Sequence, residues 1–257
     1  MGEKSVCEGK TNNIMVQKVL VVDAGNTRLK WTAFDGNEVI GKVYDNDPHS
    51  FDNFYPDIIY FASVRSNEQN AMLHADIQAA YPNVEWLPIV VEATSCGVTN
   101  SYEEPHRLGV DRWLSSIAAY HESKGATLVF DAGTAIKADF VNGQGVHLGG
   151  YIVPGLKMMK EGLVSNTARI RYSNDELGKG QGIPNNTAGA VELGCEEMAV
   201  GFVERLKRLY PDYVWFATGG GGKTLITSAG ANCICDEHLV AKGAKLVGDE
   251  IIENRKA

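Results

Sequence analysis

The sequence predicts an α/β protein built from two lobes that repeat one plan, with a cleft between them. Its 257 residues contain two similar stretches, Val19–Phe34 (VLVVDAGNTRLKWTAF) and Leu128–Val141 (LVFDAGTAIKADFV). Each is an apolar run that ends in Asp-Ala-Gly and continues through Thr to an aliphatic residue and Lys. Strand and helix patterns alternate after each copy, which is typical of α/β architecture. Because the copies lie about one lobe apart in the chain, we expect them to face each other.

The first lobe is expected over residues 18–115. Residues 1–17 are polar and carry no apolar periodicity, so we expect a disordered N-terminal extension there. Continuous apolar runs predict buried strands, and apolar residues at helical spacing predict helices. In chain order, the predicted elements are the first hairpin, a strand at Asp57–Val64, a helix at Asn67–Tyr81, a strand at Val84–Val91 and a helix at Asp111–Ser123 that leads into the second lobe.

The second lobe is expected over residues 116–257. After the second hairpin, the patterns predict a strand at Val146–Val153, a helix at Leu156–Leu163, a long helix from about Thr187 to Tyr210, a strand at Tyr213–Ala217 and a helix at His238–Asn254. The long helix contains Gly189, Gly194 and Gly201, each of which costs up to ~1 kcal/mol relative to Ala. Close packing explains these glycines, either between the lobes or at the seam of a homodimer.

The composition limits the partners of the chain. A formal net charge of −8 without a basic stripe argues against nucleic acid or an anionic membrane. No apolar stretch approaches the ~20 residues of a membrane span, and the start lacks the apolar core of a signal peptide. We therefore expect a cytoplasmic protein whose five scattered cysteines are reduced thiols.

The two hairpins have the chemistry of a phosphate and cation site. A strand that turns at Gly places Asp23 or Asp131 at its end and leaves backbone N–H groups free beside it. A single Asp of this kind would more simply close its own turn, but two copies favour a polyphosphate such as ATP, gripped from both lobes. Asn26, Thr27 and Thr134 supply further donors. Lys30 and Lys137 either add positive charge there or are surface lysines, and the sequence leaves both readings open.

A third candidate lies between the hairpins, where Gly109-Val-Asp111-Arg112 opens a helix. Taken alone, this pattern is a helix cap with a surface ion pair. Its position beside two phosphate hairpins favours phosphoryl transfer, in which an Asp accepts the proton of the attacking hydroxyl. Asp111 is then the proton acceptor, and Arg112 could hold a substrate carboxylate by a forked contact.

A glycine turn at Ala217–Thr224 (ATGGGGKT) satisfies a loose P-loop pattern, which we reject. A P-loop fold needs most of its parallel sheet after this motif, and too little of the sequence follows Thr224. The turn is better interpreted as a place where the backbone approaches a flat group such as adenine.

Five blocks in order resemble the type III pantothenate kinases, members of the acetate and sugar kinase/Hsp70/actin superfamily. The matching blocks are Asp23–Thr27 (DAGNT), Gly109–Arg112 (GVDR), Asp131–Ala135 (DAGTA), Leu148–Gly155 (LGGYIVPG) and Thr218–Gly220 (TGG). The resemblance implies two ribonuclease H-like (actin-like ATPase) lobes with a nucleotide cleft. It also implies ATP-dependent phosphorylation of the 4′-hydroxyl of pantothenate to 4′-phosphopantothenate, the first step of coenzyme A biosynthesis.

The same resemblance implies a set of site residues. Asp111 is the catalytic proton acceptor, and Asp131 holds a monovalent cation, K⁺ or NH₄⁺. ATP with Mg²⁺ is bound by Asp23, Ala24, Gly25, Asn26, Thr27, Arg28, Leu29, Lys30 and Thr134. Pantothenate is bound by Tyr102, Gly109, Val110, Asp111, Arg112 and Thr187. Family members are typically homodimers.

The chain departs from the family pattern at two positions of the second hairpin. Ala132 stands where an aromatic residue is usual, and Lys137 where Thr or another neutral residue is common. Thr187 has a helix N-cap as its alternative role. Two other functions remain as alternatives. One is a sugar or polyphosphate kinase or phosphatase of the same superfamily, and the other is a catalytically silent nucleotide-binding regulatory protein.

Overall fold

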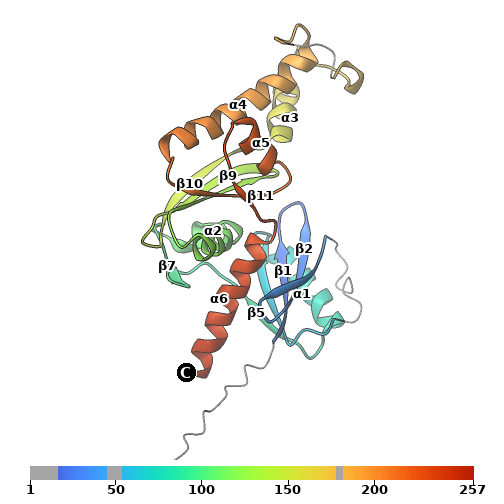
Figure 1. The fold of residues 1–257 in the computed structure, drawn as a ribbon. Helices are drawn as coiled ribbons and strands as arrows, with labels where there is room; N and C mark the ends of the chain where they lie inside the picture. The colour runs from blue at the N-terminus through green and yellow to red at the C-terminus, as the bar shows by residue number, and fades with distance from the viewer. Residues whose placement is uncertain (1–16, 45–53, 178–181) are drawn as a thin grey trace, which may run out of the picture.

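The structure, a computed structural model, describes residues 17–44, 54–177 and 182–257. Nearly all of the predicted N-terminal extension, residues 1–17, lies outside the described residues. Figure 1 shows two sheets, one above the other, with two helices between them: α2 (Val110–Ser123) and α6 (Leu239–Lys256). Within the described residues, no helix has the length and apolar character needed to span a membrane.

The first sheet has the strand order β3-β2-β1-β4-β5, with α1 (Asn67–Ala80) on one face. Strand β1 pairs antiparallel with β2 and parallel with β4. Its residues are buried on both faces, because Val19 and Val21 join the core with α2 and α6 while Leu20 and Val22 join the core with α1. The strands span Lys18–Ala24 (β1), Leu29–Asp35 (β2), Glu38–Val43 (β3), Ile58–Ser63 (β4) and Glu85–Pro88 (β5).

The second sheet repeats this plan in the order β12-β11-β8-β9-β10, and two more strands, β7 and β6, extend it beyond β10. Strand β8 pairs antiparallel with β9 and parallel with β11, as β1 does with β2 and β4. The predicted duplication is therefore confirmed in strand order and direction. The remaining elements are β6 (Thr94–Ser95), β7 (Val98–Asn100), β8 (Thr127–Ala132), β9 (Ala135–Val141), β10 (Val146–Pro154), β11 (Val214–Thr218), β12 (Ile234–Cys235), α3 (Leu156–Asn166), α4 (Thr187–Leu209), α5 (Gly222–Ser228) and the short 3₁₀ helices Pro105–Arg107 and Asn174–Glu176.

Strands β6 and β7 belong to the second sheet, although their residues fall within the predicted first lobe. Residues 18–115 are predicted to form the first lobe, yet β7 pairs parallel with β10 in the second sheet. The open edge of β10 provides hydrogen-bonding groups for β7, and this pairing draws residues 94–100 to the second lobe.

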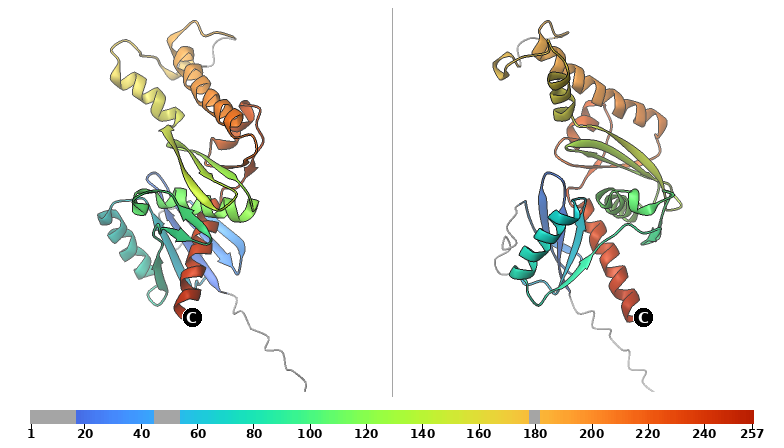
Figure 2. Two further views of the ribbon diagram at one scale, coloured as in Figure 1. Left: turned by 90° about the vertical axis from the view of Figure 1, so that its left-hand side faces the viewer. Right: turned by 180° about the vertical axis from the view of Figure 1, so that it is seen from behind.

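Helices α2 and α6 join the lobes through a shared core. Gly243 of α6 lies so close to α2 that a Cβ atom there would be 2.0 Å from the carbonyl oxygen of Leu114. Gly248 of α6 similarly leaves room for the Tyr60 ring on β4. The result is a helix of the second lobe that packs against the sheet of the first, as both views of Figure 2 show.

Candidate active site

The tips of the two hairpins touch between the lobes. Thr27 follows β1 and Thr134 follows β8, and their Oγ1 atoms are 2.9 Å apart. Each tip is closed by a backbone hydrogen bond, from the Gly25 N–H to the Arg28 carbonyl and from the Gly133 N–H to the Ala135 carbonyl. Two of the predicted phosphate donors, one from each lobe, are therefore side by side.

Each hairpin also pairs its Asp with its Lys. Asp23 lies opposite Lys30 in the β1–β2 register, and Asp131 lies opposite Lys137 in the β8–β9 register. The Nζ–Oδ2 distances are 3.2 Å in the first pair and 2.9 Å in the second. Burial raises the pKa of the Asp23 carboxyl, and the neighbouring Lys30 ammonium offsets part of that effect. Both lysines are thus part of the site rather than free surface lysines.

Asp111 joins the second of these pairs. It lies in the first turn of α2, where a carboxylate is stabilised by the positive end of the helix dipole. Its Oδ2 is 2.8 Å from the Lys137 Nζ, so one ammonium bridges Asp111 and Asp131. Burial would lower the pKa of Lys137, but the carboxylates of Asp131 and Asp111 outweigh burial and raise it. The two carboxylates therefore favour the protonated, cationic form of Lys137.

Arg112 makes its forked contact with the protein itself. Its Nε and Nη2 donate to the two carboxylate oxygens of Asp139, at 2.8 and 2.6 Å, and both side chains are buried. The Nη1 atom donates to the Tyr102 hydroxyl at 3.1 Å, and His147 Nε2 lies 3.1 Å from Asp139 Oδ1. The guanidinium fork of Arg112, which was expected to hold a substrate carboxylate, is occupied by Asp139, a residue not among the predicted site residues.

Two glycines of the sequence blocks Leu148–Gly155 and Thr218–Gly220 make room for these charged groups. A Cβ atom on Gly150 would lie 2.6 Å from Asp139 Oδ1 and 2.9 Å from Arg112 Nη2. Gly219, which has a φ of +75°, lies over Asp131, and a Cβ atom there would be 2.3 Å from Asp131 Oδ1. The glycine turn after β11 therefore approaches the Asp131 carboxylate.

Several of these groups line one small cavity where the start of α2 meets the second sheet. It combines a carboxylate at a helix N-terminus, an ammonium and a second carboxylate, an arrangement suited to handling a proton beside negative charge. The lining residues are Asp111, Arg112, Ser115, Val129, Asp131, Lys137, Asp139, Thr218 and Val240.

Thr187 is not brought to this cavity within the chain. It is the first residue of α4, and the start of α4 lies at the far end of the second lobe in Figures 1 and 2. The helix cap is Asn186, whose side chain accepts a hydrogen bond from the Gly189 N–H at 2.7 Å. The alternative role of Thr187 as the N-cap is therefore wrong.

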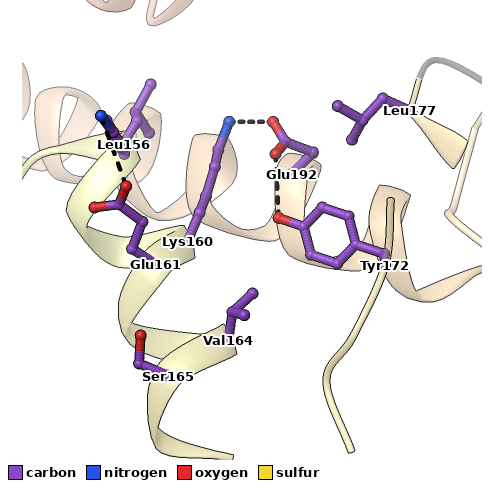
Figure 3. Close-up of a pocket in the computed structure, with 9 residues that line it drawn as sticks. Leu156, Lys160, Glu161, Val164, Ser165, Tyr172, Leu177 and Glu192 are labelled. Carbon is purple, nitrogen blue, oxygen red and sulfur yellow. Dashed lines mark hydrogen bonds and ion pairs between the residues drawn. The ribbon is translucent and has the colours of Figure 1, made fainter. Parts of the chain in front are cut away.

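A second pocket lies between α3 and α4, away from the predicted site residues. Figure 3 shows Lys160 of α3 paired with Glu192 of α4, which also accepts a hydrogen bond from the Tyr172 hydroxyl at 3.4 Å. The structure gives this pocket a wall of mixed apolar and charged side chains, with none of the aspartates of the central cavity.

Comparison with known proteins decides the family. The profile of the type III pantothenate kinase family matches residues 19–208. The chain belongs to the type III pantothenate kinases. A type III pantothenate kinase of Marinomonas sp. (strain MWYL1) is 54% identical over 239 residues, which cover 93% of this chain and 98% of that protein. The enzyme of Pseudomonas putida (strain W619) is 38% identical and covers 79% of this chain and 88% of its own length.

Solved structures support the fold of this pantothenate kinase. A candidate Baf family transcriptional activator of Campylobacter jejuni matches with a TM-score of 0.57 at 20% identity, covering 91% of this chain and 99% of that one. A candidate N-acetylmannosamine kinase of Listeria monocytogenes matches with a TM-score of 0.51 at 11% identity, covering 92% and 99%. At these identities the likeness concerns the fold alone, which is the two-lobed actin-like fold expected from the sequence.

Proposed function

We propose that this pantothenate kinase transfers the γ-phosphoryl group of ATP to the 4′-hydroxyl of pantothenate, with Asp111 as the proton acceptor. The observation that carries this proposal is the position of Asp111 in the cavity beside the second hairpin, 2.8 Å from the Lys137 ammonium. Phosphoryl transfer needs mainly positioning and charge stabilisation, and a carboxylate that accepts the hydroxyl proton completes the arrangement. The product is 4′-phosphopantothenate, the first intermediate of coenzyme A biosynthesis.

ATP is proposed to lie with its phosphates between the hairpin tips. Kinases use ATP with a divalent metal, and we propose Mg²⁺, which is commonly held by one or two carboxylates together with the phosphates. Asp23 is the carboxylate that we assign to this ion. Support comes from the contact between Thr27 and Thr134, which places two hydroxyls where one phosphate can accept from both. The proposed ATP contacts are Asp23, Ala24, Gly25, Asn26, Thr27, Arg28, Leu29, Lys30 and Thr134.

A K⁺ or NH₄⁺ ion at Asp131 fits this chain poorly. One oxygen of the Asp131 carboxylate is 2.9 Å from the Lys137 ammonium, and the other lies under Gly219. A second cation would have to displace Lys137 or share its carboxylate with it. We therefore assign no step of the reaction to a monovalent ion.

Pantothenate is proposed to bind beside the start of α2. Asp139 occupies the Nε and Nη2 atoms of Arg112. The Nη1 atom, which donates to the Tyr102 hydroxyl, is therefore the part of Arg112 that we assign to substrate contact. This pair can serve a carboxylate or amide of the substrate, since the hydroxyl both donates and accepts. The proposed substrate contacts are Tyr102, Gly109, Val110, Asp111 and Arg112. Thr187, which the resemblance also implies, starts α4 at the far end of the second lobe and is not among them within one chain.

We also propose that the kinase is a homodimer that uses α4 as its interface. Met198 and Leu193 of α4 are exposed apolar side chains, at 69% and 43%. Gly194 and Gly201 of the same helix have open space where a Cβ atom would be. Exposed apolar side chains beside small residues are suited to close packing against a second copy.

The reaction is tested by ADP release from purified protein with Mg²⁺-ATP, with and without pantothenate, and by the mass of the product. We expect ADP release to depend on pantothenate and the product to carry one phosphoryl group. ATP binding without turnover would instead favour the nucleotide-binding regulatory protein, and turnover with a different acceptor would reassign the substrate.

A further inference from the structure

The Asp131 carboxylate already has a cation beside it, and that cation belongs to the chain. Lys137 Nζ is 2.9 Å from Asp131 Oδ2 and 2.8 Å from Asp111 Oδ2. Its side chain is only 21% exposed, so water competes little for these contacts. The other oxygen of Asp131, Oδ1, lies close to the Gly219 backbone, where a Cβ atom would be only 2.3 Å away. The carboxylate assigned to a monovalent ion is thus paired with an ammonium on one side and crowded by backbone on the other.

We infer that the ammonium of Lys137 takes the place of the monovalent cation in this kinase, which therefore works without K⁺ or NH₄⁺. The inference rests on the proposed phosphorylation of pantothenate at the Asp111 site. It concerns the residue at which this chain departs from the family pattern, where a neutral side chain leaves Asp131 free for an ion.

The chemistry of the two cations makes the replacement reasonable. A lysine ammonium is a compact single positive charge with three N–H donors. Two of these donors serve Asp111 and Asp131, which leaves the third for an oxygen of the transferred phosphoryl group. A tethered ammonium also avoids the entropic cost of capturing a free ion from solution.

The charge balance of the site leads to the same conclusion. Three carboxylates, Asp23, Asp111 and Asp131, lie among two ammonium groups, Lys30 and Lys137. Lys30 forms an ion pair with Asp23 in the first hairpin. Lys137 is therefore the one ammonium that Asp111 and Asp131 share. Replacing Lys137 with a neutral residue would leave the two carboxylates of Asp111 and Asp131 without a cation, and a K⁺ ion bound there would restore the one positive charge that was removed.

The test compares the wild type with Lys137→Thr at one ionic strength in potassium, ammonium, sodium and tetramethylammonium chloride. We expect the wild type to release ADP at rates within about twofold in all four salts. We expect Lys137→Thr to lose about tenfold or more in sodium and tetramethylammonium, the size of a lost charged hydrogen bond, and to recover in potassium or ammonium. Lys157→Thr is the control, because the Lys157 side chain is 87% exposed on α3.

A second readout is the melting temperature in the same salts, without substrates. A ligand that binds the folded state raises the melting temperature, so potassium should stabilise Lys137→Thr more than sodium does, and should not do so for the wild type. Lys137→Gln repeats both measurements if the Thr variant does not fold.

Three results would overturn the inference. These are a wild type that needs potassium, a Lys137 variant that is equally active in all salts, and a folded Lys137 variant that neither potassium nor ammonium stabilises or reactivates. Failure of the proposed function is distinguishable, because a wild type inactive toward pantothenate in every salt would still give a melting-temperature comparison for the cation.

Discussion

Lys137 and Asp139 lie two residues apart on β9, so both side chains leave the same face of the sheet. Lys137 holds Asp111, and Asp139 holds Arg112, the next residue of α2. The second strand of the hairpin therefore fixes two consecutive residues at the start of one helix. This arrangement orients Asp111 toward the cavity and directs the Arg112 side chain inward.

The role of Asp111 is tested by Asp111→Asn. An amide keeps the size of the side chain and can still accept from Lys137, but it cannot take up the proton of the attacking hydroxyl. We expect kcat to fall by ~10²–10⁴ while ATP binding is retained, the range of a lost general base. Steady-state ADP release and equilibrium nucleotide binding measure the two quantities. Normal turnover would remove Asp111 from the proposed role.

The glycine turn before Lys223 provides a second test at the scale of one residue. Lys223 is exposed in the first turn of α5, whereas the turn itself approaches Asp131 through Gly219. We expect Lys223→Ala to change kcat by less than about threefold, since a removed exposed lysine leaves the backbone of the turn intact. A loss of several orders of magnitude would instead support the rejected P-loop interpretation, in which this lysine contacts phosphate.

At the scale of elements, the contact of α6 with α2 depends on a missing side chain. Gly243 lets the two helix backbones meet beside Leu114, and the hydrophobic core around Trp113 and Val247 closes around that contact. A helix interior normally disfavours Gly, so the cost of its flexibility is offset by this close approach.

A matched pair of substitutions measures this contact. Gly243→Ala would place a Cβ atom 2.0 Å from the Leu114 carbonyl oxygen, and we expect a loss of ~1–3 kcal/mol in the free energy of unfolding. Gly162→Ala, within α3, meets nothing within 4 Å and should gain up to ~1 kcal/mol. Urea unfolding of both variants gives the comparison, and equal effects would mean that the contact carries no special constraint.

At the scale of the whole molecule, the repeat could be predicted because each copy is recognisable from a short, continuous stretch of sequence. Both hairpins carry the same strand, turn and Lys spacing, and the structure gives both sheets the same strand order. Strands β6 and β7 could not be predicted, since two or three residues carry no periodicity and β10, with which β7 pairs, is distant in sequence. The contact of Arg112 with Asp139 was not predicted either, because the two residues are distant in sequence. An Asp within a buried strand, on the same face as Lys137, could have indicated that a basic partner lies opposite it.

The proposed homodimer is tested by two methionines of matching exposure. Met198 on α4 is 69% exposed, and Met72 on α1 of the first lobe is 67% exposed. A glutamate at an apolar interface is costly to bury, so Met198→Glu should raise the dimer dissociation constant by at least about tenfold. Met72→Glu should leave it unchanged. Sedimentation at several protein concentrations measures both, and a wild type that is monomeric at all of them would contradict the proposal.

The shared core of α6 also bears on how the protein acquires its structure during synthesis. Val19 and Val21 of β1 lie in the same buried cluster as Ala244 and Val247 of α6, although the ribosome makes α6 long after β1. Domains generally fold as units in the order in which they emerge. Here the face of the first sheet that carries Val19 and Val21 shares its core with α2 but is not fully covered until α6 leaves the ribosome, so the nascent chain exposes apolar residues of β1 to which a chaperone can bind.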